Sequence, residues 1–419
     1  MRIFHVADLH FGKIVYGLSM LEDQRHWCDR LLRLCDEEKP DAVLIAGDIY
    51  DRAAPGGDAV ELLDYLLTAL AERGIQVLMV AGNHDSGQRL AFARTMLAAQ
   101  NVHIAGSIDP KTGRIEQVYL EDPDGFGPIR FWLMPYTYPE QIRLALGEGS
   151  EENCRTYGEA VSALLSAQDI DINERNVILA HQNVTVDGRE IERGGSETMV
   201  GGVGQIDFHV FDPFDYVALG HIHSGYPVGR PEVRYAGTPI HYHFDEIRRQ
   251  DKGIVEVVLT AKGQPARIRT LPIRPLHAMR LIEGKRQEVY DLLEADEGRD
   301  EYVGITLTDE RVTPETAGYL RGILQLRGSR LLQLQSTFAE FAGKGAFAAA
   351  EAVREKAVED LFADFYEEQT GGDLPDEDEY ELLKFAAELI RRREEDQPLQ
   401  QEEIDQLLEH AGIRGGEDK

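Results

Sequence analysis

The sequence predicts a layered α/β protein with a small second α/β domain and a helical tail. Short apolar runs bounded by turn residues recur through about the first 260 residues, and helical patterns separate several of them. Continuous apolar runs are typical of strands buried on both faces. Alternation of strands and helices is typical of layered α/β domains. The pattern becomes wholly helical and acidic after about residue 341.

We assign residues 1–272 to the first domain and expect seven strands in it. These are RIFHVAD from residue 2, AVLIAGD from 42, QVLMVAGNHD from 76, NVILAHQ from 176, YVALGHIH from 216, VRYAGTP from 233 and GIVEVVL from 253. Helical patterns occupy residues 19–38 and 57–74, and the second closes on Gly74 as a C-cap.

Residues 273–340 show a shorter alternation. The segments HAMRLIEG, KRQEVYDLLEA, YVGITLTDE, PETAGYLRGILQL and RLLQLQ predict a β-α-β-α-β order. Residues 341–419 are predicted to form an acidic tail, with amphipathic helices at DEDEYELLKFAAELIRRR and QEEIDQLLEHAG separated by Pro398. Such helices are suited to docking on a partner helix. The alternative is that they pack back on their own domain.

Composition limits the class of protein. The chain is 42% hydrophobic and 28% charged, and its N-terminal apolar run is interrupted by His5 and Asp8, so we expect no signal peptide, no membrane span and a cytoplasmic location. Three cysteines are an odd number and argue against a disulfide framework. Cys28 and Cys35 fall on one helical face with leucines, which favours a core position over metal binding.

The formal charge of −31 opposes nucleic-acid binding, because proteins that hold DNA usually present a basic surface. Residues 351–419 contain 23 acidic and 8 basic residues, so this segment carries 15 of the 31 excess negative charges. About half of the acidity therefore belongs to the tail and not to the first domain.

Five of the expected strands end in residue types that bind metals. These residues are Asp8, His10, Asp48, Asn83, His84, His181, His221 and His223, in the motifs DLH, GD, GNHD, AHQ and GHIH. Ligand sites of α/β sheets form at the carboxyl ends of strands, so the five motifs are expected to meet in one crevice. Within DLH and HIH the two polar residues are separated by one residue and therefore leave the same face of the strand. One such motif alone is more often a surface turn, but five in this order are hard to obtain by chance.

The chemistry of these side chains favours two metal ions. Carboxylate, amide and imidazole ligands without a thiolate suit Mn²⁺, Fe²⁺ or Zn²⁺ in octahedral-like sites. Two aspartates, four histidines and one asparagine are too many for one ion. A pair of ions about 3.5–4 Å apart, bridged by one carboxylate, would use them all and would catalyse in-line displacement at phosphorus.

At these motifs the sequence resembles the calcineurin-like metallophosphoesterases, and more narrowly the SbcD family of nuclease subunits of bacterial SbcCD complexes. The resemblance rests on HVADLHFGK from residue 5, LIAGDIYDRAAP from 44, VAGNHDS from 80, LAHQNV from 179, FDYVALGHIH from 214 and RYAGTPIHYHFDE from 234. It covers the chain to about residue 270, and the remainder more loosely. It implies a β-sandwich flanked by helices, with a small α/β capping domain.

The resemblance also implies a role for each site residue. Asp8, His10 and His223 would bind the first ion, Asn83, His181 and His221 the second, and Asp48 would bridge the two. His84 would act near the scissile phosphate as an acid or charge stabiliser, oriented by Asp85. Archaeal relatives often carry a second histidine after the GD motif, where this chain has Asp51. Two interpretations of Asp51 stay open, a catalytic role and a turn or helix-capping role.

The function implied by the resemblance is a Mn²⁺-dependent DNA nuclease of repair and recombination. It would be a 3′-5′ exonuclease and endonuclease on DNA ends or hairpins, a homodimer within a heterotetramer with an SbcC-type coiled-coil ATPase. The chain itself lacks the GxxxxGK[ST] loop of ATPases. Two alternatives stay open, namely a stand-alone enzyme for a small phosphoester and a non-catalytic scaffold.

Basic and histidine residues near the motifs allow two readings. Lys13, Arg52, Arg89 and Arg94 could meet DNA phosphates at the rim of the crevice, although solvated surface charge is the simpler reading for each. His241 and His243 repeat the HxH spacing but follow the ligand motifs, so we expect them to lie outside the site.

Overall fold

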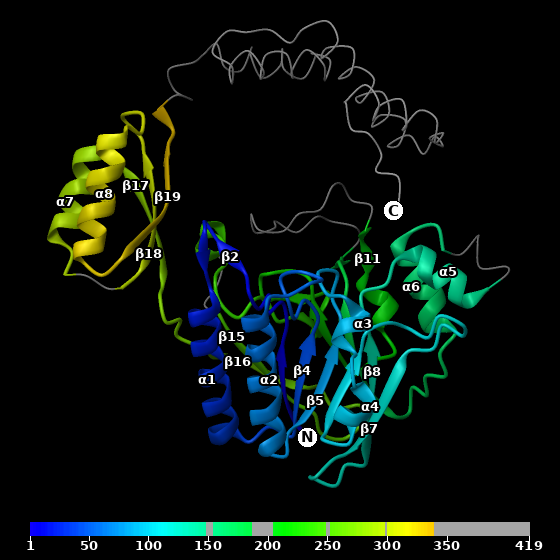
Figure 1. The fold of residues 1–419 in the computed structure, drawn as a ribbon. Coiled ribbons are helices and arrows are strands. Elements are labelled where there is room, and N and C mark those ends of the chain that lie inside the picture. The colour runs from blue at the N-terminus through cyan, green and yellow to red at the C-terminus, as the bar shows by residue number, and fades with distance from the viewer. Residues whose placement is uncertain (148–153, 187–203, 249–251, 298–299, 339–419) are drawn as a thin grey trace, which may run out of the picture. The chain divides into compact units, whose positions relative to one another are not determined.

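The computed structural model describes residues 1–147, 154–186, 204–248, 252–297 and 300–338 (Figure 1). The predicted tail, with its two amphipathic helices, lies outside these residues. Among the residues that the structure describes, no helix is both long and apolar enough to cross a lipid bilayer.

Two six-stranded sheets form the centre of the first domain. The first has the order β16-β15-β1-β4-β5-β6 and the second the order β13-β14-β12-β9-β8-β7. The first contains β1 (Arg2–Val6), β4 (Ala42–Ala46), β5 (Gln76–Val80), β6 (Val102–Ala105), β15 (Gly253–Val258) and β16 (Arg267–Pro272). The second contains β7 (Glu116–Glu121), β8 (Pro128–Met134), β9 (Arg175–His181), β12 (Tyr216–Gly220), β13 (Pro227–Val228) and β14 (Arg230–Tyr235).

Both sheets have a parallel centre. Strands β1, β4, β5 and β6 are parallel neighbours, and so are β8, β9, β12 and β14. Parallel strands need covering on both faces, and side chains alternate accordingly. In β4, Ala42 and Leu44 belong to the core between the sheets, whereas Val43 and Ile45 belong to the core on the helical side. The seven predicted strands and the predicted β-sandwich flanked by helices are confirmed.

Helices cover the outer faces of the sandwich (Figure 1). Helices α1 (Leu21–Glu38) and α2 (Gly57–Glu72) cover the first sheet, and α5 (Pro139–Leu146) and α6 (Tyr157–Ser166) cover the second. Smaller elements are α3 (Gly87–Leu90), α4 (Arg94–Ala98), η3 (Phe208–Phe211), η4 (Phe244–Arg248) and the short strands β2 (Ile14–Val15), β3 (Leu18–Ser19), β10 (Val184–Thr185) and β11 (Ile206–Asp207). Cys28 and Cys35 are buried in the core beneath α1, as predicted.

The segment after β16 has the predicted β-α-β-α-β order. Its elements are β17 (Met279–Gly284), α7 (Arg286–Ala295), β18 (Tyr302–Leu307), α8 (Pro314–Leu326) and β19 (Arg330–Ser336), with a core of their own. Buried Asp23 on α1 joins this segment to the sandwich. Its carboxylate accepts hydrogen bonds from the Tyr302 hydroxyl at 2.7 Å and from the backbone N–H of His277 at 3.2 Å.

Candidate metal centre

The eight predicted site residues meet where β1, β4, β5, β9 and β12 end. Asp8 and His10 follow β1, Asp48 follows β4, and Asn83 and His84 follow β5. His181 is the last residue of β9, and His221 and His223 follow β12. Within each sheet these strands are parallel, so their carboxyl ends lie at one edge of that sheet, and the side-chain contacts across the two sheets bring the two edges together. The contacts below link every one of the eight to another member of the set.

Asp48 lies at the middle of the cluster. Its Oδ2 is 3.7 Å from His10 Nε2 and 3.4 Å from His181 Nε2. Its Oδ1 accepts a hydrogen bond from the backbone N–H of His84 at 2.9 Å, so Oδ2 is the oxygen that faces the imidazoles.

Two groups of side chains flank Asp48. On one side, His10 Nε2 and His223 Nε2 are 3.2 Å apart. On the other, Asn83 Oδ1 is 3.0 Å from His181 Nε2 and 3.1 Å from His221 Nδ1. Asp8 borders the second group, since its Oδ1 accepts a hydrogen bond from the backbone N–H of His221 at 2.9 Å and lies 3.9 Å from His181 Nδ1.

The backbone is strained at four of these residues. Asp8, His10, Asp48 and His221 have φ values of 53°, 45°, 49° and 103°, in the left-handed region that L residues seldom adopt. Strain of this kind costs about 1–3 kcal/mol per residue and clusters at functional sites. Gly82 allows a further close approach, since a Cβ there would lie 2.1 Å from Asp48 Oδ1. The fold therefore holds these side chains in place at a cost in stability.

Burial perturbs the ionisable groups strongly. It raises the pKa of Asp8 to about 7, against the opposing charge of His181. Burial also opposes ionisation of Asp48, but the neighbouring His181 outweighs it and holds the pKa of Asp48 well below its usual value. Burial alone would lower the pKa of His181, yet the adjacent Asp48 raises it to about 9. Two buried carboxylates thus depend on nearby positive charge.

The residues present fit divalent cations. Asp8 Oδ2 is buried and makes no hydrogen bond within the described part of the chain. His181 Nδ1 lies 2.8 Å from the carbonyl oxygen of Ala46, to which it donates in the neutral tautomer, leaving the Nε2 lone pair facing the oxygens of Asn83 and Asp48. His181 Nε2, Asn83 Oδ1 and Asp48 Oδ2 are three acceptors that face one another, so a proton or a cation is needed between them. Cations also suit the donor set, which contains oxygen and imidazole nitrogen only.

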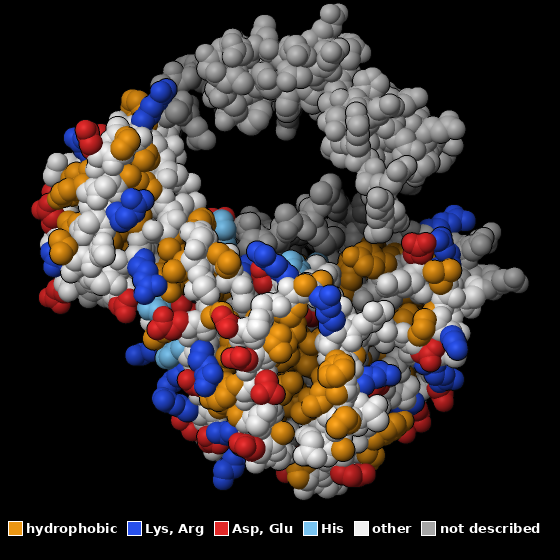
Figure 2. Space-filling view, in the orientation of Figure 1, with side chains coloured by type: hydrophobic (Ala, Val, Ile, Leu, Met, Phe, Trp, Pro, Cys, Tyr) orange, Lys and Arg blue, Asp and Glu red, His pale blue; other side chains and the backbone are white. Residues whose placement is uncertain are grey.

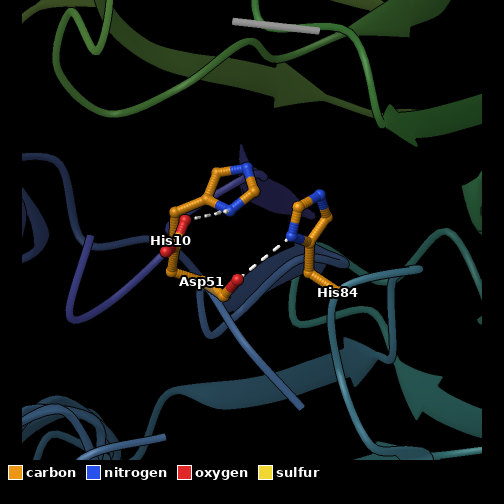
Figure 3. A group of neighbouring side chains, drawn as sticks. All are labelled: His10, Asp51 and His84. Carbon is orange, nitrogen blue, oxygen red and sulfur yellow. Dashed lines mark hydrogen bonds and ion pairs between the residues drawn. The ribbon is translucent and has the colours of Figure 1, made fainter. Parts of the chain in front are cut away.

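His84 stands at the open side of the cluster, with its side chain 41% exposed. Its Nδ1 lies 3.1 Å from the backbone carbonyl oxygen of Asp51 (Figure 3). Its Nε2 lies 4.0 Å from Asp48 Oδ2. The Asp51 carboxylate is 3.7 Å from His10 Nδ1 and accepts a hydrogen bond from Lys13 Nζ at 2.6 Å. Asp51 therefore contacts both histidines and is more than a turn residue, which the sequence alone did not indicate.

The expectation that Asp85 orients His84 is wrong. The carboxylate of Asp85 instead accepts hydrogen bonds from three backbone N–H groups, those of Ile49 at 3.0 Å, Tyr50 at 2.9 Å and Gly82 at 2.9 Å. Asp85 thus ties the loop after β4 to the loop after β5, and the backbone of Asp51 takes the orienting role.

A second residue that contacts the metal centre, Glu246, was not predicted from the sequence. Glu246, 1% exposed, places Oε1 3.5 Å from Nδ1 of His223, on the side of the ring away from His10. Its Oε2 lies 3.0 Å from Lys252 Nζ, which also donates to the backbone carbonyl oxygen of His223 at 2.9 Å. The PIHYHF stretch contributes Tyr242, whose hydroxyl donates to the carbonyl oxygen of Leu9 at 2.5 Å. The signal that could have found Glu246 is its position just after this stretch.

The fold and this cluster are those of a phosphoesterase with candidate metal-binding residues. The calcineurin-like phosphoesterase family model matches residues 1–225, and the model described as the type 5 capsule protein repressor C-terminal domain matches residues 275–370. The SbcD subunit of the SbcCD nuclease of Staphylococcus epidermidis is 28% identical over 312 residues, covering 74% of this chain and 79% of that protein. The corresponding SbcCD nuclease subunit of Staphylococcus saprophyticus is 30% identical over 293 residues, covering 69% and 73%.

Among solved structures, a dimetal phosphatase from Danio rerio is 14% identical and covers 66% of this chain and 98% of that one, with a TM-score of 0.36. That score is too low to support an argument about this chain. The family models and the curated relatives suffice: the chain belongs to the calcineurin-like phosphoesterases and, within them, to the SbcD family of nuclease subunits. It is a phosphodiester hydrolase.

Proposed function

We propose that this protein is a two-metal-dependent DNA nuclease that acts as the SbcD-type subunit of an SbcCD-type complex in DNA repair and recombination. It would act on DNA ends or hairpins, as a 3′-5′ exonuclease and as an endonuclease. One observation carries the proposal, namely the convergence of seven candidate metal ligands, Asp48 among them, from five strand ends into one network of contacts.

The proposed ligand sets follow the two groups that flank Asp48. His10 and His223 would hold one ion, and Asn83, His181 and His221 the other, with Asp48 bridging them. Asp8 is assigned to the first ion on the family resemblance, since its carboxylate lies 3.9 Å from His181 Nδ1 and accepts a hydrogen bond from the backbone N–H of His221. Mn²⁺ suits this mixture of oxygen and imidazole ligands. Bound there, two ions would activate a water molecule and neutralise charge that develops on the phosphate.

The protein's own groups would position the substrate and move protons. His84 is exposed at the mouth of the cluster and its Nδ1 is held by the Asp51 carbonyl group, which directs Nε2 toward the cluster. In this orientation Nε2 would donate a proton or a hydrogen bond to the leaving oxygen. Asp51 would act through His84 and His10 without touching the substrate.

Arginine near the mouth supports a DNA substrate despite the acidic chain. Arg52 is 73% exposed and follows Asp51 directly. Lys13 donates to Asp51 at 2.6 Å, Arg89 to the backbone carbonyl oxygen of Ala53 at 3.0 Å and Arg94 to a carboxylate oxygen of Glu116 at 2.7 Å. Arg52 Nε makes a longer contact, 3.8 Å from Asp51 Oδ2. Of the four basic residues singled out in the sequence, Arg52 is therefore the one that we propose for phosphate contact.

We further propose that the chain forms a homodimer. Phe92 and Met96 are 80% and 76% exposed in the segment of α3 and α4. A neighbouring groove of about 520 Å³ is lined by Leu63, Leu67 and other apolar side chains, and apolar side chains gather there in Figure 2. In a twofold dimer the exposed Phe92 ring of each protomer could enter the apolar groove of its partner, so this patch is complementary to a second copy of itself.

The other finer assignments are proposals as well. These are a nuclease domain of residues 1–272, a capping domain of residues 273–340, a tail of residues 341–419 that docks on the SbcC-type ATPase, and a cytoplasmic location without membrane contact. The two curated relatives are named as subunits of a complex, which supports an ATPase partner for this chain.

The test is cleavage of an end-labelled DNA duplex in Mn²⁺ by wild type and His84→Ala, with the metal content of both proteins measured. His209→Ala is a matched control, because His209 is 65% exposed and pairs with Asp212 away from the cluster. We expect His84→Ala to keep two ions and lose cleavage, and His209→Ala to behave like wild type. A wild type that holds metal but leaves DNA intact, even with its ATPase partner and ATP, would refute the proposal and favour a small phosphoester.

A further inference from the structure

A cavity of about 390 Å³ opens directly beside the metal centre. Three segments line it: residues 81–87 after β5, residues 106–110 after β6 and residues 136–144 at the start of α5. Asn83 belongs both to this lining and to the cluster around Asp48. A substrate phosphate at the cluster would therefore have the cavity next to it.

Two tyrosines form the wall nearest the metal centre. The ring of Tyr136 lies 6.1 Å from the rings of both His181 and His221, and it is inclined by only 31° to the latter. Its backbone N–H donates to the Ala81 carbonyl oxygen at 2.8 Å, and its hydroxyl lies 3.2 Å from that of Tyr157. Tyr136 is thus fixed in place as a partition between the histidines and the cavity.

Tyr138 is the ring that a ligand could meet. It packs edge-on against Tyr136 with the ring centres 5.0 Å apart, and it remains 50% exposed. Its backbone N–H donates to Gln141 Oε1 at 3.1 Å, which fixes the Gln141 carboxamide at the cavity wall. An aromatic face beside a fixed amide suits a flat ring with polar edges.

The charge of the lining excludes a second phosphate site. Among the described residues that line the cavity there is no Lys or Arg, and the one ionisable acid, Asp85, is engaged by three backbone N–H groups. The remaining polar lining groups include the side chains of Asn83, Ser107 and Gln141. Neutral hydrogen-bonding groups with tyrosines match the edge and face of a nucleobase.

We propose that this cavity binds one unpaired nucleobase of the nucleotide adjoining the scissile phosphate, stacked on Tyr138. The inference rests on the proposed nuclease function and deepens it, since it names the part of DNA that this side of the site recognises. A base reaches a cavity only after it leaves the helical stack, so the bound nucleotide is single-stranded at that position. Stacking on an aromatic residue tolerates any base, so the cavity selects for an unpaired base and not for a sequence.

The experiment measures kcat/KM in Mn²⁺ for short labelled single strands. One strand carries a base at every position, and two others carry an abasic residue on either side of the first linkage cleaved. Loss of one base–aromatic stack corresponds to roughly a 5- to 150-fold effect. We therefore expect wild type to prefer the complete strand over one abasic strand by about 10-fold or more, and Tyr138→Ala to bring that ratio close to one. Tyr138→Phe, which retains the stacking face, should keep the ratio.

Tyr119→Ala is the matched control, because Tyr119 is 55% exposed on β7 and does not line the cavity. It should retain the wild-type ratio. Equal cleavage of complete and abasic strands by wild type would overturn the inference while leaving the nuclease function intact, and so would a ratio that Tyr138→Ala does not change. A metal-loaded wild type that cleaves no strand would refute the nuclease function, and this inference with it.

Discussion

The contact between Glu246 and His223 predicts that a residue outside the ligand set controls metal affinity. In Glu246→Gln the side chain keeps its volume but loses its charge, so His223 loses a buried carboxylate 3.5 Å from Nδ1. A carboxylate behind a metal-bound histidine orients the ring and raises its basicity, and loss of such a partner weakens metal binding by about 10- to 100-fold. That range corresponds to about 1.4–2.8 kcal/mol.

The same substitution also removes the charge that faces Lys252 Nζ at 3.0 Å. Because the glutamine oxygen can still accept from Lys252, we expect a smaller loss of stability than the roughly 3–5 kcal/mol typical of a broken buried pair. The assay is calorimetric titration of the metal-free protein with Mn²⁺, together with thermal unfolding in the absence of metal. The two readouts separate a lost ligand orientation from a general loss of fold.

Glu256→Gln is a matched control. Glu256 on β15 is 4% exposed and paired with Arg269 in the sheet, with no contact to the metal centre among the interactions described above. It should lower the unfolding temperature and leave Mn²⁺ affinity unchanged. The reasoning fails if Glu246→Gln binds both ions as wild type does, or if Glu256→Gln weakens metal binding equally.

Two further predictions concern the glycine beneath Asp48 and the apolar patch. Gly82→Ala should lower the unfolding temperature and the number of bound Mn²⁺ ions, because its Cβ would lie 2.1 Å from Asp48 Oδ1. The control is Gly318→Ala in α8, where the Cβ meets no atom within 4 Å and should stabilise the protein by up to about 1 kcal/mol. Normal metal content in Gly82→Ala would show that the close approach is not needed. The double substitution Phe92→Asp with Met96→Asp should give a monomer in sedimentation experiments. The control is Ile172→Asp, because the Ile172 side chain is 65% exposed outside this patch. An unchanged mass in the double variant would place any dimer interface on another surface.

The sequence predicted the strands that are marked by an apolar run of neighbouring residues. Strands β1, β4, β5, β9 and β12 are buried on both faces, so each appears as a mainly apolar run, interrupted in β1 by His5. It missed β7 and β16, which are edge strands with partly exposed, charged side chains. It also missed β6 and β8, although most of their side chains are buried. The end of each buried run located the polar cluster, because the turn and its ligands are adjacent in sequence.

The contacts between distant residues could not be predicted in this way. Asp85 was expected beside His84 because they are neighbours in sequence, yet its carboxylate reaches Ile49 and Tyr50 on another loop. Glu246 contacts His223 only because η4 packs behind the end of β12. The positive φ values of Asp8 and Asp48 likewise depend on the tertiary structure, since aspartate adopts that conformation only occasionally.

The buried and the exposed residues of the metal centre have different roles. Asp8, His10, Asp48, His181 and His223 are buried and include three of the four strained residues, so they form a fixed base in which nearby positive charge balances the two carboxylates. Asn83 and His84 are exposed, and they have different neighbours. His84 contacts Asp51 and His10, whereas Asn83 borders the cavity behind Tyr136. A phosphate held over Asp48 would thus have a proton donor on one side and a base-sized cavity on the other. The abasic substrates distinguish which side of the cleaved linkage enters that cavity.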